Sequence, residues 1–252
     1  MRIASLYRYP VKGLSPEPLP QARLEAGSYF PGDRLYAIEN GPSGFDPKNP
    51  EHQPKIKYLM LMRNESLARL KTRYDDATQT LGIAYEGKPA VEGDLSTAEG
   101  RQAVEQFFGG YMPSELRGPA KVLTAPSGYR FTDSRRGFVS LINLASVAEI
   151  ESIVDAPVDP LRFRGNLYVE GMAARSELDL VDATLAIGSD VKLRILKRTE
   201  RCAATNVDPA TGLRDLFIPR ALMRTFEHTD CGVYAEVLNG GVVKPGDEVR
   251  IV

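Results

Sequence analysis

Short runs of mixed apolar and polar residues, each bounded by Gly, Pro or Asp, recur along the whole chain. They cover residues 3–9, 21–29, 35–39, 58–62, 79–85 and 120–124, and later 166–170, 183–187, 191–196, 232–238 and 248–252. Their lengths and residue types are those of β-strands. The 22 glycines and 18 prolines supply the tight turns that so many short strands require. The chain is therefore predicted to be mostly β.

Few segments have a helical pattern. Ser96-Thr97-Ala98-Glu99 is a capping box that predicts a helix through Phe108, ended by Gly109-Gly110. Ser146-Val147-Ala148-Glu149 repeats this device, and Pro219 in a first helical turn predicts a short helix through Phe226. Residues 65–74 carry a weaker helical pattern.

Many strands with scattered short helices indicate an α+β, mostly β fold with curled or barrel-like sheets. A chain of 252 residues can form one large domain or two closely packed ones. A change in the residue pattern at residues 109–119 predicts a domain boundary, with one domain at residues 1–112 and the other at 113–252. The chain has no strand-to-helix turn rich in Gly, which excludes a Rossmann or P-loop fold.

The charge balance and the rarity of His exclude several functions. Lys plus Arg number 32 and Asp plus Glu 33, so we expect no nucleic-acid partner, since duplex binding needs a basic face. No run approaches the roughly 18 apolar residues of a membrane span, and Met1-Arg2-Ile3 leads directly into a strand pattern, so we expect a cytoplasmic protein without membrane contact. His52 and His228 lack metal-ligand spacing, which argues against a zinc site or a Ser-His-Asp triad.

The surroundings of Cys202 are the most informative about function. Cys202 follows the basic stretch Lys197-Arg198-Thr199-Glu200-Arg201 and precedes the turn residues Asp208-Pro209. Cations stabilise a thiolate, the form of Cys that attacks electrophiles and binds soft metals. The alternative is a small buried hydrophobe, which many free cysteines are. For Cys231 we expect core packing.

Four regions in order along the chain share a family pattern. They are Tyr9-Pro10-Val11-Lys12-Gly13 with Gly32-Asp33-Arg34; Leu161-Arg162-Phe163-Arg164-Gly165-Asn166-Leu167-Tyr168-Val169; Arg201-Cys202 with Asp208-Pro209-Ala210-Thr211-Gly212; and Cys231-Gly232-Val233-Tyr234 with Gly246-Asp247-Glu248-Val249. Together they resemble the MOSC superfamily, named after the C-terminal domain of molybdenum cofactor sulfurases, with its N-terminal β-barrel module at residues 1–112 and its MOSC domain at residues 113–252.

The resemblance implies a site for the molybdenum cofactor, Mo-molybdopterin, as in the amidoxime-reducing members of the superfamily. In these the motif cysteine is the molybdenum ligand, which makes Cys202 the expected catalytic residue and metal ligand. Positions matching Lys12, Arg34, Arg164 and Asn166 hold the pterin and its phosphate. Further expected cofactor-binding residues are Ser140, Asn143, Arg162 and Arg201. The superfamily as a whole is also associated with pyridoxal phosphate.

The chemistry of these residues agrees with such a ligand. A dithiolene-bound metal suits a soft thiolate, and a phosphate suits the fork of an Arg guanidinium or the point charge of Lys. On a strand, Arg162, Arg164 and Asn166 would share one face, which is either a site or a solvent-facing surface. Residues 201–212, which carry Cys202, are called the cysteine loop below. Asp208 either braces this loop or starts a turn. Gly165 replaces the family's usual Pro, which should loosen the backbone there.

The resemblance implies a molybdenum-pterin oxidoreductase that reduces N-hydroxylated small molecules: amidoximes, hydroxamates or N-hydroxylated bases. Electrons would come from a separate protein of the ferredoxin, cytochrome b5 or reductase type. Two alternatives remain: Cys202 carries sulfur as a persulfide for metallocofactor assembly, or the chain stores the cofactor without turnover.

Overall fold

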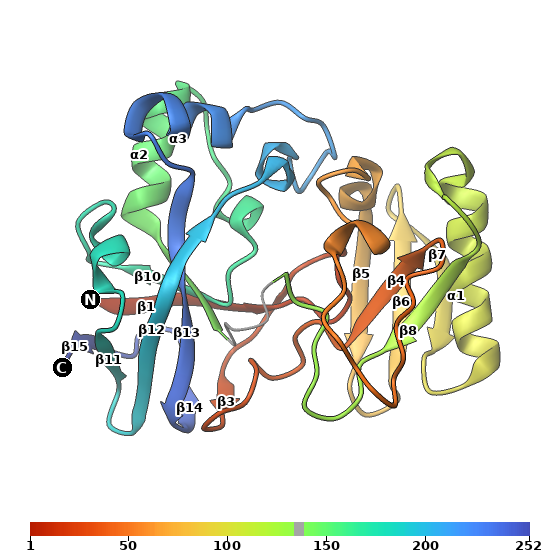
Figure 1. Ribbon diagram of the computed structural model, residues 1–252, viewed down its shortest axis with the longest axis horizontal. Coiled ribbons are helices and arrows are strands. Elements are labelled where there is room, and N and C mark those ends of the chain that lie inside the picture. The colour runs from red at the N-terminus through yellow and green to blue at the C-terminus, as the bar shows by residue number, and fades with distance from the viewer. Residues whose placement is uncertain (134–138) are drawn as a thin grey trace.

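Two sheet-based modules lie side by side in the computed structural model, which describes residues 1–133 and 139–252 (Figure 1). Each module has its own apolar core, formed by the inward-facing residues of its strands. The predicted α+β, mostly β class with curled sheets is confirmed.

The larger sheet contains eight strands within the described residues, in the order β15-β11-β12-β13-β9-β10-β1-β2. Their bounds are β1 Arg2–Arg8, β2 Glu17–Pro18, β9 Val139–Asn143, β10 Leu167–Glu170, β11 Thr184–Ile187, β12 Val191–Glu200, β13 Asp230–Asn239 and β15 Val249–Ile251. β9 and β10 run parallel, and helix α2 (Leu144–Val154) makes the crossover that parallel strands need. Helix α3 (Ile218–Phe226), predicted from Pro219, packs beside α2.

The smaller module occupies the middle of the first half of the chain. Strands β5 (Leu70–Asp75), β6 (Thr80–Tyr85) and β7 (Lys88–Asp94) form an antiparallel sheet, and β4 (Tyr36–Asn40) pairs with β8 (Ala120–Thr124). Helix α1 (Ala98–Tyr111) packs against β7 and β8 and buries Val104 and Phe108 in the core. Short 3-10 helices form several connections: η1 Lys55–Lys57, η2 Glu65–Arg69, η3 Pro113–Glu115, η4 Pro160–Phe163, η5 Ser176–Leu180 and η6 Ala203–Asn206.

The first residues of the chain belong spatially to the second module. β1 pairs with β10, with Leu6 opposite Leu167, and β3 (Ala22–Leu24) pairs with β14 (Gly241–Val243). The boundary at residues 112 and 113 stays a prediction about the sequence. Because β1 pairs with a strand of the second module, the segment that follows it, residues 9–13, lies where the two modules meet.

Two helix starts differ from the prediction. α1 is capped by Thr97, whose Oγ1 accepts a hydrogen bond from the Gly100 N–H at 3.0 Å, rather than by Ser96. α2 is capped by Asn143, and Ser146 lies inside the helix. A capping box is only a spacing of residue types, so neighbouring polar residues can satisfy it equally well.

One predicted element is wrong and another is right only in part. Residues 58–62 do not form a strand, because Tyr58 makes only an isolated bridge to Glu39. The helical pattern at residues 65–74 holds only for the 3-10 helix η2, which ends at Arg69; β5 follows, and in it buried Leu70 and Tyr74 alternate with more exposed residues. The sequence patterns also missed β2, β7, β9 and β14.

Candidate functional site

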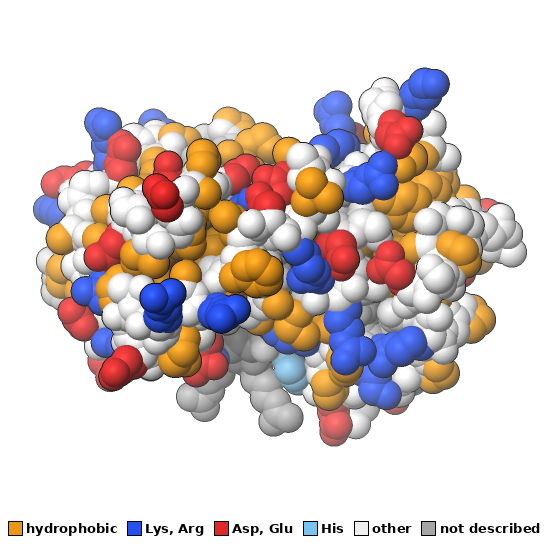
Figure 2. All heavy atoms as spheres, turned by 90° about the horizontal axis from the view of Figure 1, so that it is seen from above, with side chains coloured by type: hydrophobic (Ala, Val, Ile, Leu, Met, Phe, Trp, Pro, Cys, Tyr) orange, Lys and Arg blue, Asp and Glu red, His pale blue; other side chains and the backbone are white. Residues whose placement is uncertain are grey.

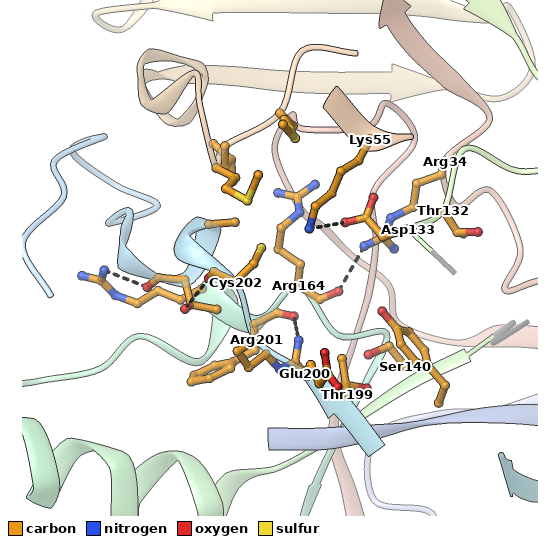
Figure 3. A pocket seen from close by; sticks show the side chains of 18 of the residues that line it. Arg34, Lys55, Thr132, Asp133, Ser140, Arg164, Thr199, Glu200, Arg201 and Cys202 are labelled. Atoms are coloured by element: carbon orange, nitrogen blue, oxygen red, sulfur yellow. Dashed lines mark hydrogen bonds and ion pairs between the residues drawn. The ribbon is translucent and has the colours of Figure 1, made fainter. Parts of the chain in front are cut away.

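A cavity of about 660 Å³ opens where the two modules meet (Figure 3). The first module contributes the turn after β1, residues 33–34, Lys55 and residues 60–62, and the second contributes the end of β12 with the residues that follow it. All predicted site residues except Asn143 line this cavity: Lys12, Arg34, Ser140, Arg162, Arg164, Asn166, Arg201 and Cys202. Segments far apart in the sequence therefore converge on one space.

Cys202 lies half-buried on the wall of the cavity as a free cysteine. β12 ends at Glu200, and Cys202 is the extended residue that caps η6. The Thr205 N–H and hydroxyl both donate to the Cys202 carbonyl at 3.0 Å, which fixes the backbone of the loop. No group of three or more His, Cys, Asp or Glu side chains that could hold a metal occurs in residues 1–133 and 139–252.

Arg162 lies beneath this loop and holds it in place. Its side chain is 1% exposed, and its guanidinium donates to the Asn206 carbonyl at 3.1 Å and pairs with Asp208 at 3.1 Å and Asp215 at 2.7 Å. Asp208 also accepts hydrogen bonds from Thr211, so it both braces the cysteine loop and starts a turn. Most of the charge of Arg162 is therefore used within the protein rather than offered to the cavity.

The predicted strand face of Arg162, Arg164 and Asn166 is wrong. Arg162 belongs to η4, and Arg164 has a left-handed φ of 53°. Gly165 does not loosen this turn: its N–H donates to the Tyr168 hydroxyl at 3.1 Å, and a Cβ atom there would lie 2.4 Å from Ile142. A proline could not make that hydrogen bond.

Three cations from distant parts of the chain meet on the cavity wall. Lys12, 6% exposed, forms an ion pair with Asp133, and the Arg34 guanidinium pairs with Asp33. The Arg34 Nη2 also donates to the Arg164 carbonyl at 3.2 Å. The Arg164 Nη2 is buried and has no hydrogen-bond partner within the described residues. An anion bound beside Arg164 would satisfy this orphaned donor.

The ring of Tyr9 holds the two arginines together. Tyr9 is fully buried, and the Cζ atoms of Arg34 and Arg164 lie 4.6 Å and 4.2 Å from its ring centroid. Cation–π attraction of this kind offsets part of the repulsion between like charges. The Arg34 N–H donates to the Tyr9 carbonyl at 2.7 Å, so backbone and ring both position the pair.

Burial and neighbouring charges shift the ionisation of the cluster. Burial lowers the pKa of Lys12 despite its pairing with Asp133, and burial with the nearby Arg34 charge lowers the pKa of Arg164 to about 10. Burial acts to raise the pKa of Asp133, but Lys12 and Lys55 outweigh it and lower that pKa to about 2. The lowered pKa values of Lys12 and Arg164 therefore come mainly from burial, and the neighbouring positive charges add to the effect.

The remaining predicted residues differ in their positions. Asn166 accepts the Ser140 N–H at 3.1 Å and donates to the Tyr7 carbonyl at 3.2 Å, so its amide fixes the cavity floor. The Arg201 guanidinium donates to the Cys231 carbonyl and to another backbone oxygen, so it too is structural. Asn143 caps α2 and donates to Glu177 at 2.9 Å, away from the cavity lining, which corrects the expectation that it faces the cofactor.

Lys55 and Asp133 line the cavity but were not predicted as site residues. Lys55 lies 3.8 Å from Asp133. Burial acts to lower the pKa of Lys55, but Asp133 and the Cys202 sulfur raise it. Lys55 lies in Gln53-Pro54-Lys55-Ile56, a segment that also resembles the family pattern, and this resemblance is the sequence signal that could have indicated it. Asp133 carries no sequence signal.

Comparisons with known proteins agree with this architecture. Residues 1–116 match the family model of the MOSC N-terminal beta barrel domain, and residues 128–250 match that of the MOSC domain. Together these matches cover both modules and nearly the whole chain. The chain belongs to the MOSC family.

Among characterised proteins, the chain is similar to mitochondrial amidoxime-reducing component 1. It is 29% identical to the human protein and 24% identical to the mouse protein over 124 residues, 44% of this chain. Those alignments span only 36% of each relative. Among solved structures, the YuaD protein from Bacillus subtilis aligns over 98% of this chain and 93% of its own, with 13% identity and a TM-score of 0.48. YiiM from Geobacillus stearothermophilus aligns over 46% and 54%, with 20% identity and a TM-score of 0.36.

Proposed function

We propose that this chain is a molybdenum-cofactor-dependent oxidoreductase that reduces N-hydroxylated compounds such as amidoximes, hydroxamates or N-hydroxylated bases. The observation that carries the proposal is a free thiol, Cys202, in one cavity with three convergent cations, Lys12, Arg34 and Arg164. The name of the human and mouse relatives, amidoxime-reducing component, supports the same reaction class.

The donor set suits Mo-molybdopterin, which offers a dithiolene-bound metal at one end and a phosphate at the other. Cys202 would supply the protein ligand to molybdenum, because a thiolate binds a soft metal well. The orphaned Nη2 of Arg164, with Arg34 and Lys12, would hold the phosphate by charge-assisted hydrogen bonds. The hydroxyl of Ser140 and the remaining amide hydrogen of Asn166 lie on the same cavity for the pterin edge. When bound, the cofactor supplies two-electron chemistry coupled to transfer of an oxo group.

The protein itself orients these groups and sets their electrostatics. Arg162 and Thr205 fix the cysteine loop, and Tyr9 fixes the two arginines. The substrate would enter between the cysteine loop and Lys55, which line the cavity from opposite modules (Figure 3). Electrons would come from a separate ferredoxin, cytochrome b5 or reductase-like protein, in keeping with the word component in the relatives' name. Within the described residues, no helix is long and apolar enough to cross a membrane.

The test combines cofactor content with turnover. Purified protein should contain molybdenum and pterin in equal amounts, and benzamidoxime should reoxidise the dithionite-reduced form. Cys202→Ala should abolish reoxidation while leaving the circular dichroism spectrum unchanged, and Cys231→Ala should retain turnover. Bound cofactor without reoxidation by any N-hydroxylated compound would instead select storage. Metal-free protein with a transferable persulfide on Cys202 would select the sulfur carrier.

A further inference from the structure

Glu177 is a buried carboxylate that the proposed function does not use. It lies in η5 with none of its surface exposed, and it forms no ion pair in the part of the chain that the structure describes. Its two oxygens accept hydrogen bonds from the Asn143 Nδ2 at 2.9 Å, the Ser146 hydroxyl at 2.8 Å and the Gly232 N–H at 3.1 Å. A buried charge is costly unless its surroundings compensate it. Acidic and basic side chains are mixed on the surface over α2 and α3 (Figure 2), so the compensation has to come from within the fold.

Two of the three donors belong to the first turn of α2. Asn143 is the N-cap, and Ser146 lies three residues further on. The positive end of a helix dipole favours an anion at this place, so Glu177 and α2 stabilise each other. If the carboxylate did nothing more, it would be an anchor for this helix. The third donor, Gly232, belongs to a different element, β13.

Gly232 is part of a β-bulge in β13. Between the pairs Arg198–Val233 and Glu200–Asp230, β12 has one residue and β13 has two. Gly232, the second of these two, has a left-handed φ of 76°, and a Cβ atom there would lie 2.5 Å from a backbone oxygen. Only glycine fits this position. Bulges occur often beside active sites, where they change the direction in which a group points.

One peptide unit of this bulge is held by opposite charges at its two ends. Its N–H, from Gly232, donates to the Glu177 carboxylate, and its carbonyl, from Cys231, accepts from the Nε and Nη2 of Arg201. The Arg201 Nη1 donates to the Phe163 carbonyl at 2.9 Å. Each charged partner polarises the peptide in the direction that strengthens the bond at its other end. The guanidinium of Arg201 therefore compensates the buried carboxylate across a single peptide unit.

We propose that Glu177 is a positioning residue: through the Cys231–Gly232 peptide it holds the Arg201 guanidinium on the cavity wall. Arg201 is the first residue of the cysteine loop, lines the cavity and directly precedes Cys202 (Figure 3). A guanidinium has five N–H donors, and three are used by these backbone bonds, so one hydrogen on each Nη remains for a ligand. The arrangement does not depend on what the cavity binds.

The test is two-dimensional NMR of the purified full-length chain. A hydrogen bond slows the exchange of an Arg Nε–H with water, and Arg201→Lys assigns this signal by deleting it. Glu177→Gln keeps the shape of the side chain and removes its charge. The Arg201 Nε–H should then exchange about tenfold faster, and the Gly232 amide proton should move upfield, because a neutral acceptor holds the peptide less strongly.

Two further variants separate positioning from a general loss of stability. Glu177→Asp keeps the charge beside α2 but is one methylene too short to reach both elements, so it should shift both signals in the same direction. Val104→Ala, in the buried core of the first module, is the control: it should lower the Tm and leave both signals unchanged.

A lowered Tm with unchanged Arg201 and Gly232 signals in Glu177→Gln would show that Glu177 only anchors α2, and would refute the proposal. If that variant does not fold, the same reading applies to Glu177→Asp. Both signals are measured without turnover, so their outcome is separate from that of the test of the proposed reaction.

Discussion

The two cysteines have different surroundings and should react differently. Burial raises the pKa of the Cys231 thiol to about 12, whereas Cys202 lines a cavity and is half-exposed. Alkylation requires both access and thiolate. Iodoacetamide at pH 8 should therefore add one group to the cofactor-free protein, located on Cys202 by peptide mass spectrometry. Cys202→Ala should take up none, and labelling of Cys231 in the folded protein would contradict the prediction.

Asp133 should give the fold an acid-sensitive contribution to stability. Its folded-state pKa of about 2 lies below the roughly 3.9 of an unfolded Asp, so its ion pair with Lys12 stabilises the fold above about pH 4. This contribution is lost as the pH falls from 4 towards 2. Asp133→Asn should therefore show a flatter decline of Tm over that range than the unaltered protein. Glu92→Gln, an exposed control, should follow the unaltered curve.

For single residues, the sequence predicted which side chains converge on the cavity but not which partners each of them has there. Lys12, Arg34 and Arg164 were found through the family pattern, and all three line the cavity. Arg162 was indistinguishable from them in the sequence, because its partners Asp208 and Asp215 lie about fifty residues away. Asp133 was missed, since only the folded chain brings it to Lys12.

At the scale of elements, the position of the cysteine loop depends on the buried side chain of Arg162, which acts as a brace. Arg162→Met should lower the free energy of unfolding by about 2–3 kcal/mol, because it leaves the loop carbonyls and two carboxylates without their donor. Urea denaturation provides the measurement. Arg198→Met removes a 42% exposed side chain that pairs at the surface and should cost less than about 1 kcal/mol. Equal losses in the two variants would show that the brace is unimportant.

At the start of α1, two substitutions test which side chain caps the helix. Thr97→Ala should lower the free energy of unfolding by about 1 kcal/mol, because it removes the acceptor of the Gly100 N–H. Ser96→Ala removes only an exposed hydrogen bond to Asp94 and should change it by less than half as much. The opposite order would restore Ser96 as the cap. Element types with strong periodicity were predictable, whereas β5 and residues 58–62 depended on partner strands that the local sequence does not reveal.

At the scale of the whole molecule, the two modules should unfold together. β1 and β3 pair with β10 and β14 of the second module, so the second module is incomplete without the first residues of the chain. Urea transitions followed by circular dichroism and by tyrosine fluorescence should coincide. A chain of residues 113–252 should be insoluble, because it exposes the β10 edge that β1 covers. Two separate transitions, or a soluble folded fragment, would contradict this.

The pairing of β1 with β10 also means that β1 cannot pair until most of the chain has been synthesised. Leu6 leaves the ribosome long before its partner Leu167 is made. At roughly 5–20 residues per second, the first strand waits on the order of ten seconds with its edge unsatisfied. Contacts between such distant positions slow folding, because a long loop must close before they form. Because the strand that draws Lys12 to the second module stays unpaired until β10 is made, we expect the nascent chain to depend on chaperones that shield unpaired strand edges.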